Sequence, residues 1–338
     1  MGISAIGGKT ILLTGGTGSF GRKFVEVALR DHDPKVVRVY SRDELKQLEM
    51  QREIDDDRVR YFIGDVRDRE RLRRAMRGVE VVVHAAALKQ VPTAEYNPIE
   101  AVKTNVDGAA NVIDAAIDCD IERGIFLSSD KAVRPINLYG ATKLVAEKLF
   151  IQANSYVGGG ATRFSCVRYG NVLGSRGSVI PLFLTARRNG VIRITVPEMT
   201  RFWITLEQGV QFVMDCVGRM EGGEVFVPKL PAMRLEDLAR TIAPEARWEV
   251  IGMRPGEKLH EELITREEAP RTREFKTFYT IEPEHRFWGV RSDGDPSTHG
   301  QPLPPGFEYV SNTAPWMLTP EELRGHLEEL GAAPEGAP

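Results

Sequence analysis

The sequence has few of the residues that mark disulfide-stabilised or metal-binding proteins. It contains three cysteines, Cys119, Cys166 and Cys216, and six histidines in 338 residues. The cysteines are odd in number and lack Cys-x-x-Cys spacing, which argues against a disulfide framework, and no His-Glu-x-x-His or other paired histidine spacing supports a metal site. We therefore expect the cysteines to pack as small apolar residues, and we expect no bound metal.

Long apolar runs and strong net charge are also lacking. The longest apolar runs, such as residues 79–88, fall well short of the roughly 18 residues that a membrane-spanning helix needs. The N-terminus has no basic segment followed by a long apolar stretch, so we expect no secretory leader, no membrane association and a cytoplasmic protein. The formal net charge of -3 gives no electrostatic case for binding nucleic acid.

What the sequence does contain is a regular alternation of strand-like and helix-like segments. Hydrophobic residues make up 42% and charged residues 28%, as in ordinary globular proteins. Apolar runs of strand length lie at 9–16, 35–42, 59–66, 79–87 and 121–130, and amphipathic stretches of helix length lie between or after them at 21–32, 68–78, 97–118 and 139–156. This pattern predicts an α/β fold, a Rossmann-like doubly wound parallel sheet with helices on both faces.

The regularity weakens after a further apolar run at 163–170. We predict a Rossmann domain over residues 1–168 that binds the cofactor and carries the catalytic residues. Residues 169–338 are predicted to form mainly a smaller α/β substrate lobe, with some segments returning to the Rossmann domain. The stretch from Arg271 indicates a loop-rich tail that ends in a short helix at 319–330, which starts at a Thr-Pro signal, and in frayed residues 331–338.

A glycine-rich segment, TGGTGSFG at residues 14–21, follows the first predicted strand and opens the first predicted helix. Glycines at this spacing allow a tight turn and let backbone amides approach a pyrophosphate, whose charge the helix N-terminus stabilises. A glycine-rich turn that binds nothing is the alternative, but the place between strand and helix favours dinucleotide binding. We expect the cofactor to contact Gly15, Thr17, Gly18, Ser19, Phe20 and Gly21.

The end of the second predicted strand bears on the choice between NADP and NAD. The segment VYSRDELKQ supplies Ser41, Arg42 and Lys46, and cationic side chains there suit a ribose 2'-phosphate, so we favour NADP. Asp43 is close enough to keep NAD open, and a solvated helix start is the structural alternative. Asp65 can accept a hydrogen bond from adenine, although a helix N-cap would also explain it. Further expected cofactor contacts are Val66, Ala85, Ala86, Ala87, Lys89 and Asn105.

Tyr139 and Lys143 are spaced i, i+4, so on a helix they share one face. A phenol titrates near ~10 and is too weak an acid to act as a base at neutral pH unaided. We expect the Lys143 ammonium, together with a positive nicotinamide, to lower the pKa of Tyr139 so that it accepts a proton from a sugar hydroxyl. Ser129 would share the hydrogen bond to that hydroxyl. A Tyr-x-x-x-Lys pair on a surface helix is the alternative.

At this point the chain resembles the extended short-chain dehydrogenases, and among them the inverting UDP-N-acetylglucosamine 4,6-dehydratases. The resemblance extends over nearly the whole chain. It rests on the segments TGGTGSFG, YSRDELKQ, HAAALKQVP, NVDGAANVIDAA, SSDKAVRPINLYGATK, RYGNVLGSRGSV, MTRFWITLEQGV and GMRPGEKLHEEL.

The resemblance implies a reaction in which the sugar is oxidised at C4, loses water across C5 and C6, and is reduced at C6. It implies that Lys131 removes the C5 hydrogen, that Asp130 protonates the departing C6 hydroxyl, and that Tyr139 and Lys143 serve the redox step. In water at pH 7, Asp130 and Lys131 would carry the wrong protons for these roles. We therefore expect a desolvated pocket that favours the neutral forms, and a bell-shaped pH profile for turnover.

The resemblance also implies a UDP-sugar substrate and a homo-oligomer. A diphosphate is best bound by arginines and backbone amides, and the expected substrate contacts are Lys89, Asn171, Arg201, Arg254 and Glu257. The segment RPGEKLHEEL also fits a Pro-Gly turn that leads into a helix. Val196 and Pro197 depart from the acidic or polar residues that the family pattern predicts before Met-Thr-Arg, in a segment where the change would alter a substrate loop.

Two other functions stay open at this stage. A UDP-sugar 4-epimerase or 5-epimerase could use the same scaffold, although pure 4-epimerisation needs no acid-base pair such as Asp130 and Lys131. A cofactor-binding scaffold without catalysis is a third reading, and the complete set of Ser129, Asp130, Lys131, Tyr139 and Lys143 argues against it.

Overall fold

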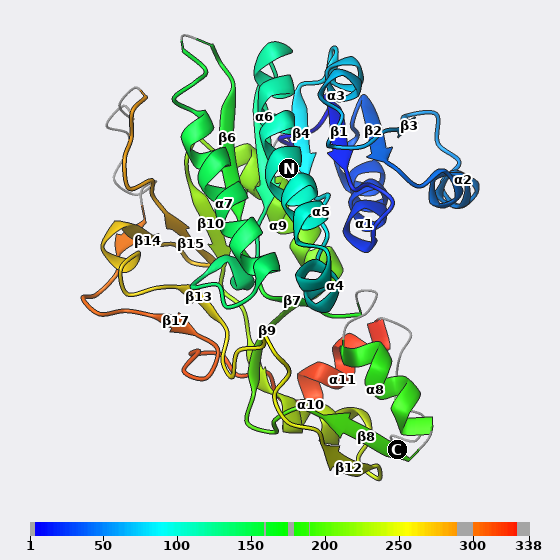
Figure 1. Ribbon diagram of the computed structural model, residues 1–338, viewed down its shortest axis with the longest axis vertical. Helices are drawn as coiled ribbons and strands as arrows, with labels where there is room; N and C mark the ends of the chain where they lie inside the picture. Colours follow the sequence, from blue (N-terminus) through cyan, green and yellow to red (C-terminus); the bar gives the residue numbers. More distant parts are fainter. Residues whose placement is uncertain (1–3, 159, 175–178, 189, 289–299, 330–338) are drawn as a thin grey trace.

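The computed structural model describes residues 4–158, 160–174, 179–188, 190–288 and 300–329. Its larger part is built on a ten-stranded sheet with the order β16-β14-β15-β10-β6-β5-β4-β1-β2-β3 (Figure 1). The run from β10 to β3 is parallel. It comprises β1 (Thr10–Thr14), β2 (Val36–Ser41), β3 (Val59–Ile63), β4 (Val81–His84), β5 (Arg123–Leu127), β6 (Arg163–Val167) and β10 (Val225–Pro228). The order β3-β2-β1-β4-β5-β6 confirms the predicted Rossmann-like sheet.

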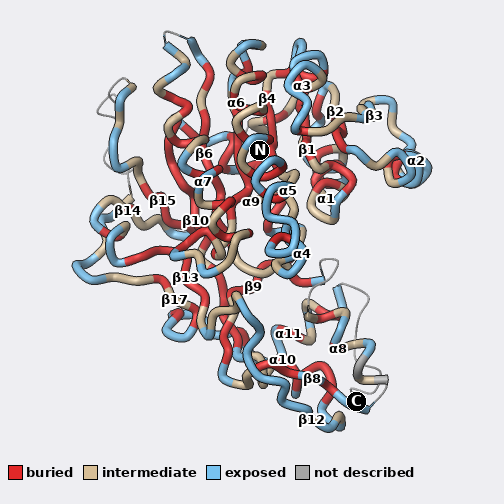
Figure 2. Tube along the Cα trace, viewed as in Figure 1, coloured by how far each residue is buried: buried red, intermediate tan, exposed pale blue. Residues whose placement is uncertain are grey.

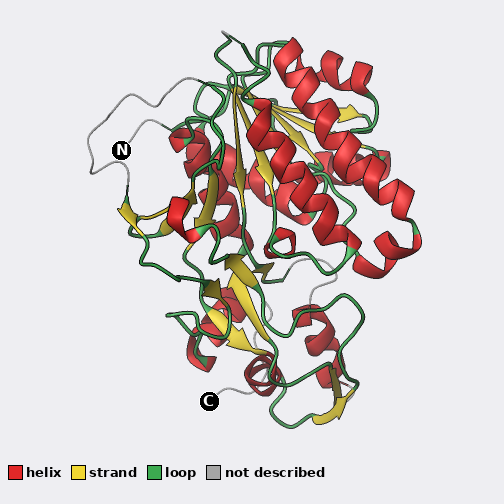
Figure 3. Ribbon diagram, turned by 60° about the vertical axis from the view of Figure 1, so that its left-hand side comes forward, coloured by secondary structure: helices red, strands yellow, loops and turns green. Residues whose placement is uncertain are grey.

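Helices cover both faces of this sheet (Figure 3). On one face α3 (Arg69–Met76), α6 (Gly108–Asp118) and α7 (Leu138–Ala153) pack side by side, and on the other α1 (Ser19–Val27) contacts α9 (Leu206–Arg219). The chain continues from α1 through a π-helical turn at Ala28–His32, and α2 (Glu44–Glu53) follows β2. All residues of β1 and β4 are buried, as expected for apolar strands covered by helices on both faces.

The single long helix predicted over 97–118 is interrupted. It consists of α5 (Pro98–Val102), a π-helical turn at Lys103–Asp107 and α6, and a separate helix α4 (Val91–Tyr96) precedes it. The turn carries the buried Asn105, whose side-chain amide donates hydrogen bonds to Leu88 O at 2.9 Å and Thr142 Oγ1 at 3.0 Å and whose Oδ1 accepts one from Leu88 N at 2.8 Å. These long-range bonds place Asn105 inward, which a sequence pattern cannot reveal.

A smaller part with its own buried core lies beyond the carboxyl end of the sheet (Figures 1 and 2). It contains the helices α8 (Val179–Arg188), α10 (Leu235–Ile242) and α11 (Pro320–Glu329) and the paired strands β8 (Val191–Ile194) and β12 (Arg247–Val250). Between the two parts lie a three-stranded sheet of β7 (Asn171–Val172), β9 (Thr200–Ile204) and β11 (Ala232–Arg234) and the pair β13 (Glu262–Ile264) and β17 (Tyr309–Val310).

Several segments after residue 168 belong to the larger part of the molecule. Besides β10 and α9, these are β14 (Thr272–Glu274), β15 (Phe278–Ile281) and β16 (Gln301–Pro302), which extend the sheet in antiparallel pairing. The region from Arg271 is thus more regular than the predicted loop-rich tail, and a 3-10 turn at Ala269–Arg271 precedes it. The domain boundary at 168 stays a prediction.

The final helix begins where the Thr-Pro signal predicts it. Thr319 Oγ1 accepts a hydrogen bond from Glu322 N at 3.2 Å, and the Glu322 side chain accepts one from Thr319 N at 2.8 Å. The predicted frayed end (331–338), residues 289–299 of the predicted loop-rich tail and part of the RYGNVLGSRGSV segment (175–178) lie outside the described residues. Among the described helices, none is long and apolar enough to cross a membrane. Cys166 and Cys216 are buried free thiols, and Cys119 is a half-buried one.

Candidate active site

A cavity of about 680 Å³ lies where the parallel strands end. Ligand sites of α/β sheets form at this edge, outside the carboxyl ends of the strands. The cavity brings together most of the residues that the sequence predicts for cofactor and catalysis. These are Gly15, Thr17, Gly18, Ser19, Phe20, Ser41, Arg42, Lys46, Asp65, Val66, Ala85, Ala86, Ala87, Lys89, Ser129, Asp130, Lys131, Tyr139, Lys143 and Asn171.

The glycine loop is shaped so that main-chain atoms line one end of the cavity. Gly15 has a φ of +68°, and a Cβ there would lie 2.9 Å from the main chain of Ala86. Gly18 is the N-cap of α1 and offers no side chain to the first amides of the helix. Gly21 is not in the cavity lining, because the helix packs there against the main chain of Gly16. Uncapped amides behind a close glycine turn fit a dinucleotide pyrophosphate.

The end of the cavity that Arg42, Lys46 and Asp65 line carries paired charges. Lys46 Nζ lies 2.6 Å from Asp43 Oδ2, and Asp43 also accepts a hydrogen bond from Lys46 N as the N-cap of α2. Arg42 Nη1 lies 3.6 Å from Asp65 Oδ2. The Asp43 carboxylate is thus engaged by its own helix, whereas the Arg42 side chain is about half exposed toward this end.

Asp65 does not cap a helix, contrary to the structural alternative weighed from the sequence. Its carboxylate accepts hydrogen bonds from the main chain and side chain of Arg67, and the N-cap of α3 is Asp68, which accepts from Arg71 N at 2.9 Å. The chain makes an additional turn, with Asp68 N donating to Asp65 O at 3.0 Å, before the helix begins. The cap position therefore lies three residues later than the pattern indicates.

Tyr139 and Lys143 lie on α7, face the cavity and are both buried. Lys143 Nζ donates a hydrogen bond to Leu127 O at 2.7 Å and sits 4.5 Å from the centre of the Phe126 ring. Burial lowers the pKa of Lys143 to about 7. Burial also raises the pKa of Tyr139 to about 12, against an opposing effect of Lys131. Without a bound nicotinamide, desolvation of the phenolate is the larger effect, and the lowering of the Tyr139 pKa by Lys143 together with that ring stays a prediction.

Asp130 and Lys131 form a short 3-10 turn with Ala132, directly after Ser129. Lys131 Nζ donates a hydrogen bond to Asp130 Oδ1 at 3.1 Å, and Ser129 Oγ donates one to the same oxygen at 2.7 Å. The Asp130 side chain is fully buried, and its Oδ2 has no hydrogen-bond partner among the described residues. The pair therefore lines the cavity that also contains Tyr139, with one carboxylate oxygen left for a ligand.

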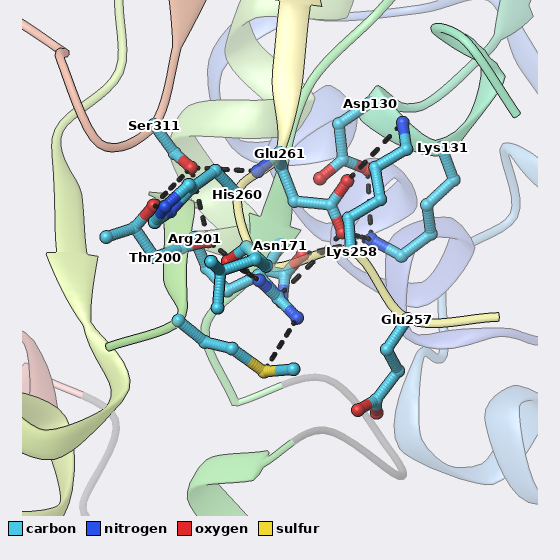
Figure 4. A network of polar contacts seen from close by, with 12 residues as sticks. Asp130, Lys131, Asn171, Thr200, Arg201, Glu257, Lys258, His260, Glu261 and Ser311 are labelled. Atoms are coloured by element: carbon cyan, nitrogen blue, oxygen red, sulfur yellow. Dashed lines mark hydrogen bonds and ion pairs between the residues drawn. The ribbon is translucent and has the colours of Figure 1, made fainter. Parts of the chain in front are cut away.

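Glu261 joins this pair, and the sequence reading missed it. Its Oε1 lies 3.4 Å from Lys131 Nζ and 3.8 Å from Arg201 Nε, and its Oε2 lies 4.0 Å from Lys258 Nζ (Figure 4). Although burial opposes the charged form, the two carboxylates raise the pKa of Lys131 above its ordinary value. Without substrate, the pocket therefore does not favour the neutral form of Lys131 as predicted, because Glu261 adds a second carboxylate that stabilises the ammonium.

The predicted substrate residues divide into two groups. Lys89 and Asn171 line the cavity, and burial together with the Lys131 charge lowers the pKa of Lys89. Arg201 is not part of the cavity lining, and it donates hydrogen bonds to the main-chain oxygens of Thr200 and Leu259.

The segment that carries Arg254 and Glu257 lies apart from this lining. Arg254 is exposed, and its Nη1 is 3.9 Å from Glu257 Oε1, while the Glu257 side chain points away from the cluster around Lys131 (Figure 4). The segment turns at Gly256, with a φ of +78°, and continues into strand β13, so the alternative reading of a turn leading into a helix is wrong. Asn105, another predicted cofactor contact, also lies outside the lining, because its amide is fully engaged with Leu88 and Thr142.

Comparison with known proteins agrees with this fold. The model of the polysaccharide biosynthesis protein family matches residues 11–283. The chain belongs to this family. It is 50% identical over 321 residues to a protein of Campylobacter jejuni (strain 81-176) named UDP-N-acetylglucosamine 4,6-dehydratase (inverting), covering 94% of this chain and 96% of the relative. The resemblance to the inverting dehydratases of the extended short-chain dehydrogenases is thereby confirmed.

Three further proteins bear on the alternatives and on the fold. A protein of Rickettsia conorii named UDP-glucose 4-epimerase is 43% identical over 286 residues, covering 82% of this chain and 84% of the relative. The solved structure of Pen from Bacillus thuringiensis is 38% identical, with a TM-score of 0.86, and the match covers 96% of this chain and 99% of that one. The structure of DesIV, a dTDP-glucose 4,6-dehydratase from Streptomyces venezuelae, shares the fold. It is 22% identical with a TM-score of 0.66, and the match covers 74% of this chain and 86% of that one.

Proposed function

We propose that the chain is an inverting UDP-N-acetylglucosamine 4,6-dehydratase that works with a nicotinamide dinucleotide. The activity is the one named for a relative 50% identical over 94% of the chain. The structural observation that carries the proposal is the hydrogen-bonded pair of Asp130 and Lys131, 3.1 Å apart, in the same cavity as Tyr139 and Lys143. Reversible oxidation at C4 alone needs only the second pair, whereas elimination of water needs an acid and a base as well.

The glycine loop and the Tyr139–Lys143 pair suit the redox part of the reaction. The glycine loop would hold a nicotinamide dinucleotide, which would supply the hydride chemistry needed at C4 and C6. Tyr139 takes the proton of the C4 hydroxyl as the ketone forms, with Ser129 holding the same oxygen. Because burial raises the pKa of Tyr139 to about 12, the positive charges of Lys143 and of the nicotinamide ring are needed to stabilise the phenolate.

The Asp130–Lys131 pair suits the elimination. The C4 ketone acidifies the C5 hydrogen, which Lys131 removes as a proton, and the electron pair of that bond forms the C5–C6 double bond. Asp130 donates its proton to the C6 hydroxyl, which leaves as water. After reduction at C6 a proton that derives from solvent adds to C5 from the opposite face. The product has lost one water and carries a C4 ketone and a C6 methyl group.

Three finer features belong to this proposal. We propose NADP as the cofactor, because Arg42 and Lys46 lie at the adenosine end of the cavity while Asp43 is engaged with Lys46 and its own helix. We propose a homo-oligomer, supported by exposed apolar side chains on adjacent helices, with Tyr96 86% and Ile99 63% exposed. Location in the cytoplasm stays a prediction.

Incubation with UDP-N-acetylglucosamine in deuterated water tests the function. We expect a product lighter by one water, with deuterium at C5 and inverted configuration at that carbon, as read by mass spectrometry and NMR. An epimerase, the activity named for the Rickettsia relative, would conserve the molecular formula. A scaffold without catalysis would return the substrate unchanged, and either result would contradict the proposal.

A further inference from the structure

The Lys131 ammonium is surrounded by three oxygen acceptors from three parts of the chain. Its Nζ lies 3.1 Å from Asp130 Oδ1, 3.3 Å from Asn171 Oδ1 and 3.4 Å from Glu261 Oε1 (Figure 4). Asp130 is its neighbour in sequence, Asn171 begins β7, and Glu261 directly precedes β13. Three contacts in different directions fix the position of an otherwise flexible side chain.

Glu261 is a buried carboxylate without a strong partner of its own. Its side chain is 4% exposed, and its Oε2 accepts no hydrogen bond from the described residues. Arg201 at 3.8 Å and Lys258 at 4.0 Å are beyond hydrogen-bond distance. The main chain of Glu261 is held by its N–H, which donates to Ser311 Oγ at 2.9 Å. A buried carboxylate costs free energy unless it is paired, and the nearest cation is Lys131.

The charges that face Lys131 come from several elements. The carboxylates are Asp130 and Glu261. The cations are Lys89 after β4, Arg201 on β9 and Lys258 before β13, and the titratable phenol of Tyr139 on α7 also faces Lys131. The three cations Lys89, Arg201 and Lys258 disfavour a charged Lys131, and Asp130 alone would have to offset all three. The second carboxylate therefore decides the balance.

We propose that Glu261 is a positioning residue of the dehydration step, which holds Lys131 against Asp130 and keeps the lysine protonated until its proton passes to Asp130. The transfer runs along the 3.1 Å hydrogen bond from Nζ to Oδ1. It breaks one N–H bond, forms one O–H bond and leaves a neutral amine beside a neutral carboxylic acid. These are the forms that removal of the C5 proton and departure of water require. The inference rests on the proposed function.

Glu261→Gln tests this role, with Glu262→Gln as the matched control. Glu262 is the next residue and is also buried, but its Oε1 lies 3.5 Å from Arg134. Loss of the Glu261 charge lets Lys131 lose its proton at lower pH. In the pH profile of the rate of C5 deuterium exchange, the basic limb should therefore move to lower pH by at least about one unit. The KM should change less than kcat, and Glu262→Gln should keep the wild-type limb. Superimposable profiles of Glu261→Gln and wild type, or equal shifts in both variants, would overturn the proposal.

A measurement on the wild-type protein keeps the inference testable if Glu261→Gln does not fold. In protein labelled with 15N at the lysine side chains, the Lys131 signal is assigned by its loss in Lys131→Arg. We expect Lys131 to keep its proton beyond the ordinary lysine value near ~10.4, and loss of the proton below that pH overturns the proposal. This titration needs no turnover. The wild-type protein could fail to dehydrate UDP-N-acetylglucosamine and still hold the Lys131 proton as expected. That result would refute the proposed function but not the stabilisation of the Lys131 ammonium by Asp130 and Glu261.

Discussion

Arg168 and Glu147 form a buried ion pair, with Arg168 Nη2 2.6 Å from Glu147 Oε1. Both side chains are only 2% exposed. The same guanidinium donates hydrogen bonds to both carboxylate oxygens of Glu268, each at 3.0 Å, and to Leu263 O at 2.8 Å. Glu147 lies one turn after Lys143 on α7, and Leu263 lies on β13. The pair thus joins the helix of the redox residues to the segment that begins at Glu261.

Arg168→Ala should destabilise the protein strongly, because it leaves the Glu147 carboxylate buried without its cation. Breaking a buried pair by removing one partner costs about 3–5 kcal/mol. Urea denaturation measures this change in the free energy of unfolding. The control is Arg193→Ala, which removes an exposed pair with Glu249 and should cost less than about 1 kcal/mol. Equal losses in the two variants would contradict a structural role for the buried pair.

Lys143 should cost stability at the pH where it is charged. Burial lowers its pKa to about 7, whereas the unfolded chain has the ordinary value near ~10.4. Below pH 7 Lys143 is charged in both the folded and the unfolded protein, so the full free-energy cost of burying its charge is present. Between pH 7 and the pKa of the unfolded chain, the unfolded chain binds more protons than the folded protein, so this cost shrinks. Lys143→Met without cofactor should therefore be more stable than wild type by about 2–4 kcal/mol at pH 6.

The advantage of Lys143→Met should shrink as the pH rises from 7 toward 10. Urea denaturation at several pH values measures the difference. Lys148→Met is the matched control on the same helix, and because Lys148 is exposed its effect should be small at every pH. An advantage of Lys143→Met that does not change with pH would show that its origin is packing and not the charge of the lysine.

The parts of the site that depend on local spacing could be predicted from the sequence. Tyr139 and Lys143 lie on one helical face because the helix period fixes it, and the glycine loop lies between β1 and α1 because strand and helix patterns flank it. Asp130 and Lys131 were identified by resemblance, and the structure places both in the cavity with Tyr139.

What the sequence could not reveal depends on contacts between distant segments. Glu261 is 130 positions from Lys131, and no spacing rule joins them although their side-chain atoms lie 3.4 Å apart. Asn105 bonds to Leu88 and Thr142 across the π-helical turn. The raised pKa of Tyr139 depends on burial, which periodicity does not quantify. The one available signal for Glu261 was a pair of acidic residues in KLHEEL, which fits a surface helix equally well.

Arg42→Ala should reduce the preference for NADP over NAD. Arg42 lines the end of the cavity proposed for the adenosine, and loss of one charge-assisted hydrogen bond to a 2'-phosphate costs about 1.5–3 kcal/mol. We expect the Kd for NADP to rise about ten-fold or more, and the Kd for NAD to change little, as measured by calorimetry on protein freed of cofactor. Arg60→Ala, an exposed arginine on β3 outside the lining, is the control. Parallel losses for both cofactors would argue against a 2'-phosphate contact.

Lys131→Met should separate oxidation of the sugar from loss of water. Tyr139 and Lys143 remain in place, so the sugar is still oxidised at C4, but no amine takes the C5 proton. Loss of a positioned base lowers a rate by about 10²–10⁴-fold. In deuterated water we expect C5 exchange and water release to fall together by that factor, while the absorbance of the reduced cofactor still rises after substrate is added. Tyr139→Phe should instead suppress the absorbance change as well, because the phenol acts before the elimination. If Lys131→Met released water at close to the wild-type rate, the base would have to be a group other than Lys131.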